Sequence, residues 1–408
     1  MPDGGARLAA LGLLAAAACA GGDAGAGRAV VRDSAGIAIV ENVSPDDSAA
    51  YAWWRIGELQ LDIGGEGAGP GHDLFRVSSA RRLRDGGIVV ANGGTSELRF
   101  FDTAGALVRT AGRRGDGPGE FQGISWLTGD ALDTLLVFDA RANRVSVLAP
   151  EGALARDFLL GGTGAMAAPV GRFADGGFAG RLTVLLRPGA NQAPPDGLTR
   201  PDIAIVRLDP DGRLADTIGV FPGAERFIRV TSAGGQIRSI EVTTPLFGRT
   251  PYHVAVGDEL VSATQDDPEM RVFGADGALR RIVRTGRLPE PITDAHRGAL
   301  IEKRLINVPD EGRASVRAGL EALPSAGTVP PYAALLLDRE GNLWLADYDD
   351  GLKPPGRWTV YAADGRGLAR ITLPERFTPY EIGADWILGR ELDDLDIEHV
   401  RLYAIARN

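Results

Sequence analysis

The sequence has a single cysteine, Cys19, among its 408 residues. A redox-active cysteine pair is therefore excluded, and the fold has to be stable without disulfides. A chain of this length buries enough apolar surface for that. The sequence also lacks a Ser-His-Asp order, a nucleophile elbow and a glycine-rich loop followed by Lys-Ser/Thr, so it offers no recognisable catalytic motif.

Positive charge and long apolar runs are also scarce. The chain has 44 Lys and Arg against 54 Asp and Glu, a net charge of −10. This balance argues against nucleic acid or an anionic membrane surface as a partner. Beyond Cys19, no apolar run approaches the roughly 20 residues that a membrane-spanning helix needs.

The start of the chain is typical of a bacterial secretory signal. Arg7 precedes an apolar run, residues 8–18, and Cys19 follows where a lipoprotein signal places the residue that is lipidated after cleavage. We therefore expect a lipoprotein-type signal peptide over residues 1–19 and a flexible Gly/Ala-rich tether over residues 20–28. The protein would be exported, either periplasmic or anchored to the outer membrane. Ordinary cleavage beside this cysteine, releasing a soluble exported protein, is the alternative.

Glycine and proline are abundant, with 56 Gly and 25 Pro, which favours many short strands joined by tight turns. One pattern recurs six times: an apolar run of five residues with Gly, Asp or Asn turn residues before it. The runs are residues 88–92, 135–139, 177–181, 260–264, 343–347 and 386–390.

A second pattern, an apolar residue followed by a Gly turn and a Leu, comes after each of the first five runs. Its glycines are Gly105, Gly152, Gly212, Gly277 and Gly365. Each unit thus has four antiparallel strands, and repetition of such a unit around an axis makes a propeller. A β-sandwich would not need the same two turns in the same order. We predict an all-β fold, a single six-bladed β-propeller of four-stranded antiparallel blades over residues 29–408.

The sixth unit has no Gly hairpin, so its outer strand has to come from elsewhere in the chain. A closed ring avoids leaving an exposed strand edge. Two N-terminal segments, residues 36–43 and 58–63, have strand character. We predict that residues 58–63 close the ring and that residues 36–43 pack beside them.

Two similar segments, residues 64–75 and 112–121, contain Gly-Pro-Gly and precede the first and second units. We call them the GPG loops and predict that they connect blades. With LDREGNLWLADY at residues 337–348 and D-x-x-x-N-R-V at residues 139–145, they resemble six-bladed propellers of the NHL-repeat type, and more closely the exported bacterial "6-bladed beta-propeller" proteins. The resemblance covers residues 30–408. It implies the fold but no single activity, because NHL-like propellers include binding modules, lyases and lactonases.

Two intervals between units are longer than the others. Residues 221–245 predict a hairpin insertion, and residues 288–329 predict a small helical insertion between blades 4 and 5, with Asp294 and Asp310 as caps of two helices. Both insertions follow the last strand of one blade. We therefore expect them on the face that bears the GPG loops, with the helices across the mouth of the central channel.

The charged residues of the second GPG loop are candidates for ligand binding. Arg113, Arg114, Asp116 and Glu120 would present charge suited to a carboxylate or sugar. The alternative is a rigid turn whose charges pair locally, since repeat loops are usually structural.

The four histidines follow no metal-binding spacing. We expect His72, His253 and His296 on the face of the GPG loops, with His72 and His253 as candidate ligand contacts, and His399 near the closing strand. We predict no metal and no cofactor. Calcium is the alternative, because strand-end residues that otherwise cap turns offer oxygen ligands. These residues are Asp139, Asn143, Asp347, Asp349 and Asp350.

Aromatic residues recur near the start of first strands. Tyr252, Tyr332 and Tyr380 each follow a proline, and Phe75 and Phe121 end the GPG loops. As residues of the channel wall they would form a rim on which a ligand stacks. The alternative is packing between blades.

The sequence thus predicts an exported cell-envelope protein, a monomer, that binds a small molecule or another protein on the face of the GPG loops. We expect membrane contact through the lipid anchor alone, and we expect a binding protein rather than an enzyme. A metal-dependent lactonase or lyase is the first alternative, and it requires three or more His, Asp or Glu side chains converging on the channel axis. A structural scaffold without a pocket is the second.

Overall fold

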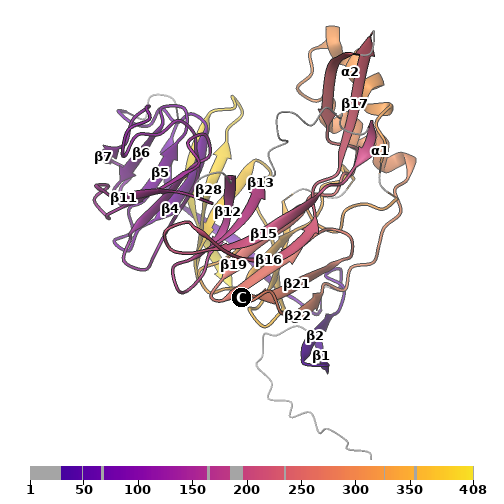
Figure 1. The fold of residues 1–408 in the computed structure, drawn as a ribbon, viewed down its shortest axis with the longest axis horizontal. Helices are drawn as coiled ribbons and strands as arrows, with labels where there is room; N and C mark the ends of the chain where they lie inside the picture. Colours follow the sequence, from indigo (N-terminus) through magenta and orange to yellow (C-terminus); the bar gives the residue numbers. More distant parts are fainter. Residues whose placement is uncertain are drawn as a thin grey trace, which may run out of the picture.

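The computed structural model describes residues 29–47, 49–65, 69–162, 166–183, 196–233, 236–325, 327–352 and 356–407. The predicted signal peptide, its Cys19 and the tether lie outside them. Strands make up most of the described chain (Figure 1). Its two helices, α1 (Asp294–Leu305) and α2 (Asp310–Glu321), both lie within the predicted insertion. The all-β, propeller-like prediction is confirmed at this level.

The strands group into four-stranded antiparallel units, which we number 1 to 6 in chain order within the described residues. Unit 1 contains β4 (Val77–Arg82), β5 (Ile88–Asn92), β6 (Glu97–Phe101) and β7 (Leu107–Ala111). Unit 2 contains β8 (Ile124–Gly129), β9 (Leu135–Asp139), β10 (Arg144–Leu148) and β11 (Leu154–Leu159). Unit 3 contains β12 (Met166–Arg172), β13 (Phe178–Thr183), β15 (Asp202–Leu208) and β16 (Leu214–Pro222).

The second half of the chain repeats this arrangement. Unit 4 contains β19 (Tyr252–Val256), β20 (Glu259–Ala263), β21 (Glu269–Gly274) and β22 (Leu279–Arg284). Unit 5 contains β23 (Ala334–Leu337), β24 (Leu343–Ala346), β25 (Arg357–Tyr361) and β26 (Gly367–Thr372). Unit 6 contains β27 (Phe377–Ile382), β28 (Trp386–Leu392), β29 (Glu398–Arg407) and, from the N-terminal part of the chain, β3 (Ala52–Gly64).

The second strand of each unit coincides with one of the six apolar runs in the sequence. These strands are β5, β9, β13, β20, β24 and β28. All five residues of β5 are buried, as are all five of β9. A strand covered on both faces is apolar at successive positions instead of alternating, which is why the runs predicted these strands correctly.

The apolar core is divided into clusters that each join two neighbouring units. Among the described residues, such clusters join units 1 and 2, 2 and 3, 3 and 4, 4 and 5, and 5 and 6. A further cluster contains Ile63 of β3 and Leu402 of β29 together with Val77 of β4 and Phe101 of β6, and so joins unit 6 to unit 1. Burial between the sheets, and not within any one of them, therefore holds the units together.

The N-terminal strands do not stay together. β3 pairs antiparallel with β29, with Ile63 opposite Val400, which agrees with the outer strand predicted for the sixth unit. β1 (Ala29–Ser34) and β2 (Ile37–Asn42) form a hairpin, and β2 pairs in parallel with β22 of unit 4. The expectation that residues 36–43 pack beside the closing strand is therefore wrong. Any outer strand offers unpaired backbone groups, so the sequence pattern could not select the edge.

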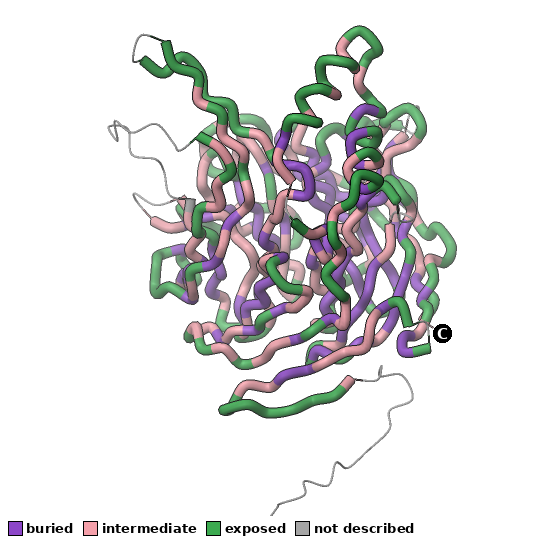
Figure 2. The backbone as a smooth tube through the Cα atoms, turned by 90° about the vertical axis from the view of Figure 1, so that its right-hand side faces the viewer, coloured by how far each residue is buried: buried purple, intermediate pink, exposed green. Residues whose placement is uncertain are grey.

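Two insertions rise from one end of the molecule (Figure 1). The hairpin of β17 (Arg226–Ala233) and β18 (Gln236–Thr243) is joined by β14 (Gly197–Thr199), and it approaches α2 at its base. Figure 2 shows that the upper parts of both insertions are largely exposed. Figure 1 shows the insertions to one side of the molecule, clear of units 1 and 2. The expectation that the helices cross a central opening is therefore wrong.

The helices occupy this place because of their apolar faces. Leu300, Ile301 and Leu305 of α1 pack against Phe247, before β19, and Tyr348, after β24. This cluster is separate from those between the units.

The predicted helix caps also need correction. The N-cap of α1 is Thr293, whose hydroxyl accepts from the His296 N–H, while Asp294 lies in the first turn. The N-cap of α2 is Pro309, and no side chain bonds there. Asp294 and Asp310 are therefore first-turn acids, which favour a helix N-terminus through the helix dipole.

Candidate functional site

The GPG loops are held by arginines from the third strand of the unit that follows each loop. In the first loop, Arg99 of β6 donates to the carbonyls of Gly71, at 2.8 Å, and Asp73, at 3.1 Å. In the second loop, Arg144 of β10 donates at 2.7 to 3.1 Å to the carbonyls of Asp116, Gly117 and Glu120. The sequence analysis did not consider Arg99, and it included Arg144 only as part of the D-x-x-x-N-R-V element, without a role.

The polar groups of the second GPG loop are directed towards one another. Glu120 accepts from the Gly117 N–H at 2.9 Å and from Arg113 at 2.7 Å. The Gly117 N–H, followed by the Arg113 guanidinium, holds the pKa of Glu120 below its ordinary value. A Cβ on Gly115 would lie 2.0 Å from a Glu120 carboxylate oxygen, so a larger residue there would displace that side chain. Arg114 donates to a carbonyl of a turn in unit 1. These contacts hold the loop in place as a connection between units. A ligand-binding role for its charged residues stays a prediction.

The other predicted site residues are spread over several interfaces. His72 accepts from the Gly64 N–H at 3.2 Å, within the first GPG loop. The rings of Tyr252 and Tyr332 lie 6.4 Å apart in the cluster between units 4 and 5. Tyr380 donates to a carbonyl of β4 at 2.7 Å. Their roles as ligand contacts remain predictions.

His253 lies at the base of the hairpin insertion. Its ring packs edge-on against Phe221, with 5.1 Å between the centroids. Its Nε2 is buried and has no hydrogen-bond partner within the described chain. Burial, assisted by the positive charge of Arg181, lowers the pKa of His253 to about 4.

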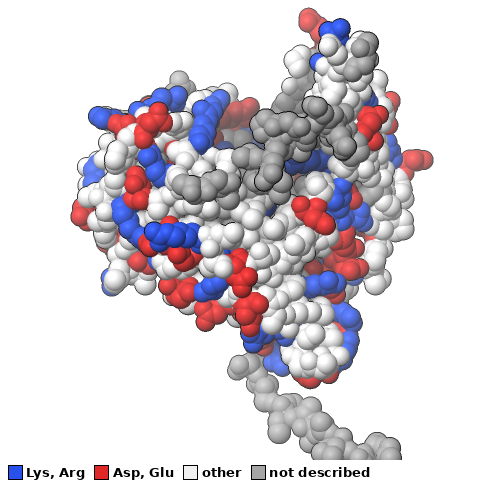
Figure 3. Space-filling model, viewed as in Figure 1, with Lys and Arg blue, Asp and Glu red and all other residues white. Residues whose placement is uncertain are grey.

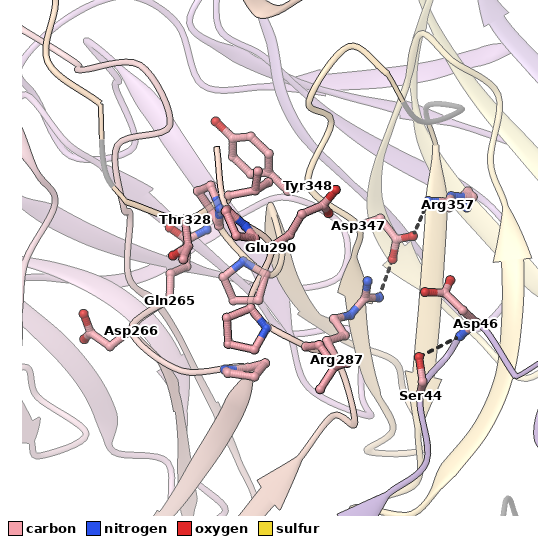
Figure 4. Close-up of a pocket in the computed structure, with 17 residues that line it drawn as sticks. Ser44, Asp46, Gln265, Asp266, Arg287, Glu290, Thr328, Asp347, Tyr348 and Arg357 are labelled. Carbon is pink, nitrogen blue, oxygen red and sulfur yellow. Dashed lines mark hydrogen bonds and ion pairs between the residues drawn. The ribbon is translucent and has the colours of Figure 1, made fainter. Parts of the chain in front are cut away.

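The candidate functional site is a pocket of about 380 Å³ between units 4 and 5, at the base of the helical insertion (Figure 4). It is lined by the segment after β22, the segment before β23 and the turns after β20 and β24, with Ser44 and Asp46 from the connection between β2 and β3. Prolines have a fixed φ and no N–H, so the walls that they form are stiff and offer no backbone donors. The prolines are Pro268, Pro289, Pro291, Pro330 and Pro331.

The pocket and the GPG loops lie at the same edge of the four-stranded units. Neighbouring strands in each unit run in opposite directions, so the second and fourth strands end at the same edge. The turns after β20 and β24 follow second strands, and the segment after β22 follows a fourth strand, as the second GPG loop does after β7. The pocket therefore lies on the face where the sequence predicted binding, although in other loops.

One end of the pocket contains arginine side chains. Asp347 accepts from Arg287, and its Oδ2 lies 3.1 Å from Arg357 and 3.6 Å from Arg370. Figure 4 shows Arg287 and Arg357 reaching Asp347 from different sides. Burial alone would lower the pKa of Arg287, but the Asp347 carboxylate outweighs it and the pKa is raised. A second carboxylate near these arginines, Asp46, lies 3.7 Å from Arg370, and its side chain is 84% exposed. Arg287 and Arg357 line the pocket here with Asp347 and Asp46, while Arg370 lies outside the lining.

Two further carboxylates line the pocket. Figure 4 shows Asp266, which pairs with Arg200, on the side away from Arg287 and Arg357, and Glu290 and Tyr348 between them. Burial raises the pKa of Tyr348 to about 12, so its hydroxyl is protonated at neutral pH and is able to donate. Glu290 Oε1 lies 3.2 Å from Nε2 of His296 on α1. The pocket thus presents both guanidinium and carboxylate groups.

A cluster of three possible metal ligands adjoins the pocket. One donor atom each of Glu290, His296 and Asp350 lies within 4.8 Å of the others. Among the described residues, this is the one group of three or more His, Cys, Asp or Glu whose donor atoms lie this close together. None of the three residues lies on the first strand of a unit. The cluster therefore lies beside α1 and not on the axis where the sequence analysis required it.

The other oxygen ligands considered for calcium are engaged elsewhere. Asp139 caps a turn, accepting from the Arg141 and Ala142 N–H groups at 2.9 and 3.0 Å. Asp347 belongs to the arginine group, and Asp349 pairs with Lys303. The local contacts of these residues are those of turn caps and ion pairs.

Sequence reasoning did not find Arg287, Glu290 or Arg357. The first two lie in GRLPEP, residues 286–291, between the last strand of unit 4 and α1. Arg357 is the first residue of β25. Only the fold brings it to the same pocket as Arg287 and Glu290. The available signal was the run of prolines, since a proline-rich connection cannot continue a strand and marks an irregular wall.

Charged side chains of both signs are interspersed over the face seen in Figure 3, without a continuous basic patch. No helix among the described residues is long and apolar enough to cross a membrane.

No family model matches the chain, and no curated protein matches it. Among solved structures, it is similar to a member of the DUF4221 family from Bacteroides vulgatus, with 12% identity over 88% of this chain and 99% of that one and a TM-score of 0.50. Other similar structures are an exported protein from Bacteroides fragilis (13% identity, 87% and 95% covered, TM-score 0.46) and a gluconolactonase from Xanthomonas campestris (13%, 86% and 97%, 0.40). The likeness to the DUF4221 family member, at 12% identity, shows the fold alone.

Proposed function

We propose that the protein is an exported β-propeller that binds a small anionic ligand in the pocket between units 4 and 5. The observation that carries this proposal is the pocket itself, about 380 Å³, with proline walls and the guanidinium groups of Arg287 and Arg357 at one end. Cavities of this size take small ligands. The planar fork of Arg matches a carboxylate in a bidentate way.

The proposed architecture is six NHL-like blades in a ring closed by β3. The cluster that contains Ile63 of β3 and Val77 of β4 supports closure, because it joins the last unit to the first. The pairing of β3 with β29 supports it as well, since it completes unit 6 with four strands. Residues 1–19 support export, with Cys19 as the proposed lipid attachment.

The charged groups of the pocket suggest the chemistry of the ligand. An anionic group would lie against Arg287 and Arg357, and hydroxyl groups would donate to Asp266 and Glu290. Tyr348 would add a donor. We therefore propose a hydroxylated carboxylic acid, such as a sugar acid, as the ligand class.

Calorimetry with a panel of sugar acids and the matching neutral sugars tests this proposal. We expect an acid to bind and its neutral sugar to bind more weakly. Arg357→Ala should weaken binding of the acid by about tenfold or more, because it removes a charged hydrogen bond.

Arg156→Ala is the matched control, since Arg156 also pairs with an aspartate, Asp211, but lies outside the pocket. The proposal fails if no acid binds, if the neutral sugars bind equally well, or if the Arg357 and Arg156 variants behave alike.

A metal-dependent lactonase or lyase is the second candidate, favoured by the position of Glu290, His296 and Asp350 beside the pocket. It predicts that a bound lactone is released in altered form, whereas a binding protein returns its ligand unchanged. Mass spectrometry of the ligand after incubation distinguishes the two. A scaffold would leave every ligand in the panel unbound.

A further inference from the structure

Glu290, His296 and Asp350 come from three separate parts of the chain and meet at one point. Glu290 lies between β22 and α1, His296 in the first turn of α1, and Asp350 between β24 and β25. Nε2 of His296 lies 3.2 Å from Glu290 Oε1 and 4.0 Å from Asp350 Oδ2. We propose that these residues bind a divalent first-row transition metal ion, of which zinc is the probe. Metal alone is used to test this inference, so it does not depend on the ligand proposed above.

The distances suit such an ion. Zinc bonds to nitrogen and oxygen at about 2.0–2.2 Å, so two ligands of a tetrahedral ion lie roughly 3.3–3.6 Å apart. The separation between His296 and Glu290 is already close to this range, at 3.2 Å. The Asp350 oxygen, at 4.0 Å from Nε2, needs to approach by well under about 1 Å.

The orientation of His296 is controlled by Thr293. Nδ1 of His296 lies 2.9 Å from the Thr293 hydroxyl oxygen and 3.2 Å from its backbone nitrogen. The Thr293 N–H donates to Nδ1, so the ring proton lies on Nε2, facing Glu290 and Asp350. Metal binding at Nε2 would move this proton to Nδ1, where the Thr293 hydroxyl is the acceptor. A second residue that sets the tautomer and the angle of a ligand histidine is common around bound metals. The imidazole is 6% exposed, so its position is set by packing as well.

Asp350 is held against α1 by its neighbours in the chain. Its Oδ1 accepts from the Leu352 N–H at 2.8 Å, so Oδ2 is the oxygen nearest His296. Gly351 has φ +79°, and a Cβ there would lie 3.0 Å from the backbone of Ala299 on α1. Asp349 pairs with Lys303 of the same helix. The loop is therefore packed closely on the helix that carries His296.

The ligand types select the class of metal. One imidazole and two carboxylates suit zinc, manganese or iron, whereas calcium prefers six to eight oxygen ligands. Three protein ligands leave at least one coordination position for water or a bound ligand. Glu290 also lines the pocket, so the cluster adjoins it.

Titration of the chelator-treated full-length protein with zinc, followed by calorimetry, tests the proposal. We expect one tight site per chain, with calcium binding more weakly. His296→Gln and Asp350→Asn should each weaken zinc binding by at least about tenfold, and Thr293→Val by about tenfold while the three ligands remain.

Two variants serve as controls. Glu302→Gln removes a carboxylate from the exposed side of α1, where it pairs with Arg317, and should leave zinc affinity unchanged. His399→Gln tests whether a histidine elsewhere accounts for the binding. If His296→Gln does not fold, Glu290→Gln replaces it, because Glu290 is 41% exposed. The proposal is overturned if no stoichiometric zinc binds, or if folded ligand variants bind zinc as tightly as the Glu302 control.

Discussion

The second GPG loop and the helical insertion occupy the same position in the repeat, between the last strand of one unit and the first strand of the next. The loop turns its polar groups on itself, since Glu120 accepts from Gly117 and Arg113 within the loop. The insertion instead presents Arg287 and Glu290 to a pocket. The GPG loop has the usual length of a connection between units, and its residues pack the units together. The helical insertion is longer, and its additional residues are able to form a binding site.

Burial separates the two regions in the same way. Phe121, at the end of the GPG loop, is fully buried between units 1 and 2. Leu288 and Ile306, at either end of the segment that leads through α1, are 87% and 69% exposed. The loop is therefore part of the core, and the insertion rests on it through one apolar cluster.

The largest expected effect is on stability in the GPG loop. Phe121→Ala should lower the free energy of unfolding by about 3–5 kcal/mol, because it leaves a cavity between two units. Ile306→Ala, an exposed position of the insertion, should change it by less than about 0.5 kcal/mol. Chemical denaturation measures both. Equal losses would remove the distinction between the two regions.

A smaller effect is expected at His253, where the hairpin insertion meets unit 4. The pKa of His253 is about 4 in the folded protein and 6.5 in the unfolded chain. The unfolded chain therefore binds the proton more readily between these values. The resulting stabilisation is complete above about pH 6.5 and is lost as the pH falls to about 4, a change of roughly 3 kcal/mol.

His253→Gln isolates this contribution, because glutamine does not titrate. The difference in unfolding free energy between the two proteins should change across this range, while the carboxylates that titrate in both cancel. A difference that is constant with pH would show that His253 is solvated in the folded state.

The smallest expected effect concerns the contact between the insertion and unit 5. Gly351→Ala should cost about 1–2 kcal/mol, because φ is +79° there and the new Cβ would press on Ala299 of α1. Zinc binding should weaken at the same time, since Asp350 would move away from His296. Gly319→Ala on α2 is the control, because it meets nothing within 4 Å. Equal behaviour of the two variants would mean that the loop does not hold α1.

Much of the fold was predictable from local pattern. The six apolar runs correspond to β5, β9, β13, β20, β24 and β28, because buried second strands are apolar throughout. The helices were predictable in place but not in their caps, since Thr293 and Pro309 occupy those positions. A cap depends on which residue first leaves helical geometry, and neighbouring Thr and Asp are both good candidates.

The candidate site was less predictable. The candidate pocket lies on the face predicted for binding, but in GRLPEP and not in the GPG loops on which the prediction rested. His296 and Asp350 were both noted, yet separately, as one of four histidines and one of several aspartates. Nothing in their spacing connects them, since one lies on a helix and the other in a turn of the next unit.

By itself the sequence determined the repeat: the number of apolar runs, the turns between strands and the places where the repeat is interrupted. These follow from apolar periodicity and turn chemistry, which act over a few residues. Only the tertiary structure decided which side chains meet. Arg287 reaches Asp347 across 60 residues of sequence, and β2 joins unit 4 and not unit 6. Such contacts depend on how whole units and insertions dock, and no local pattern encodes that.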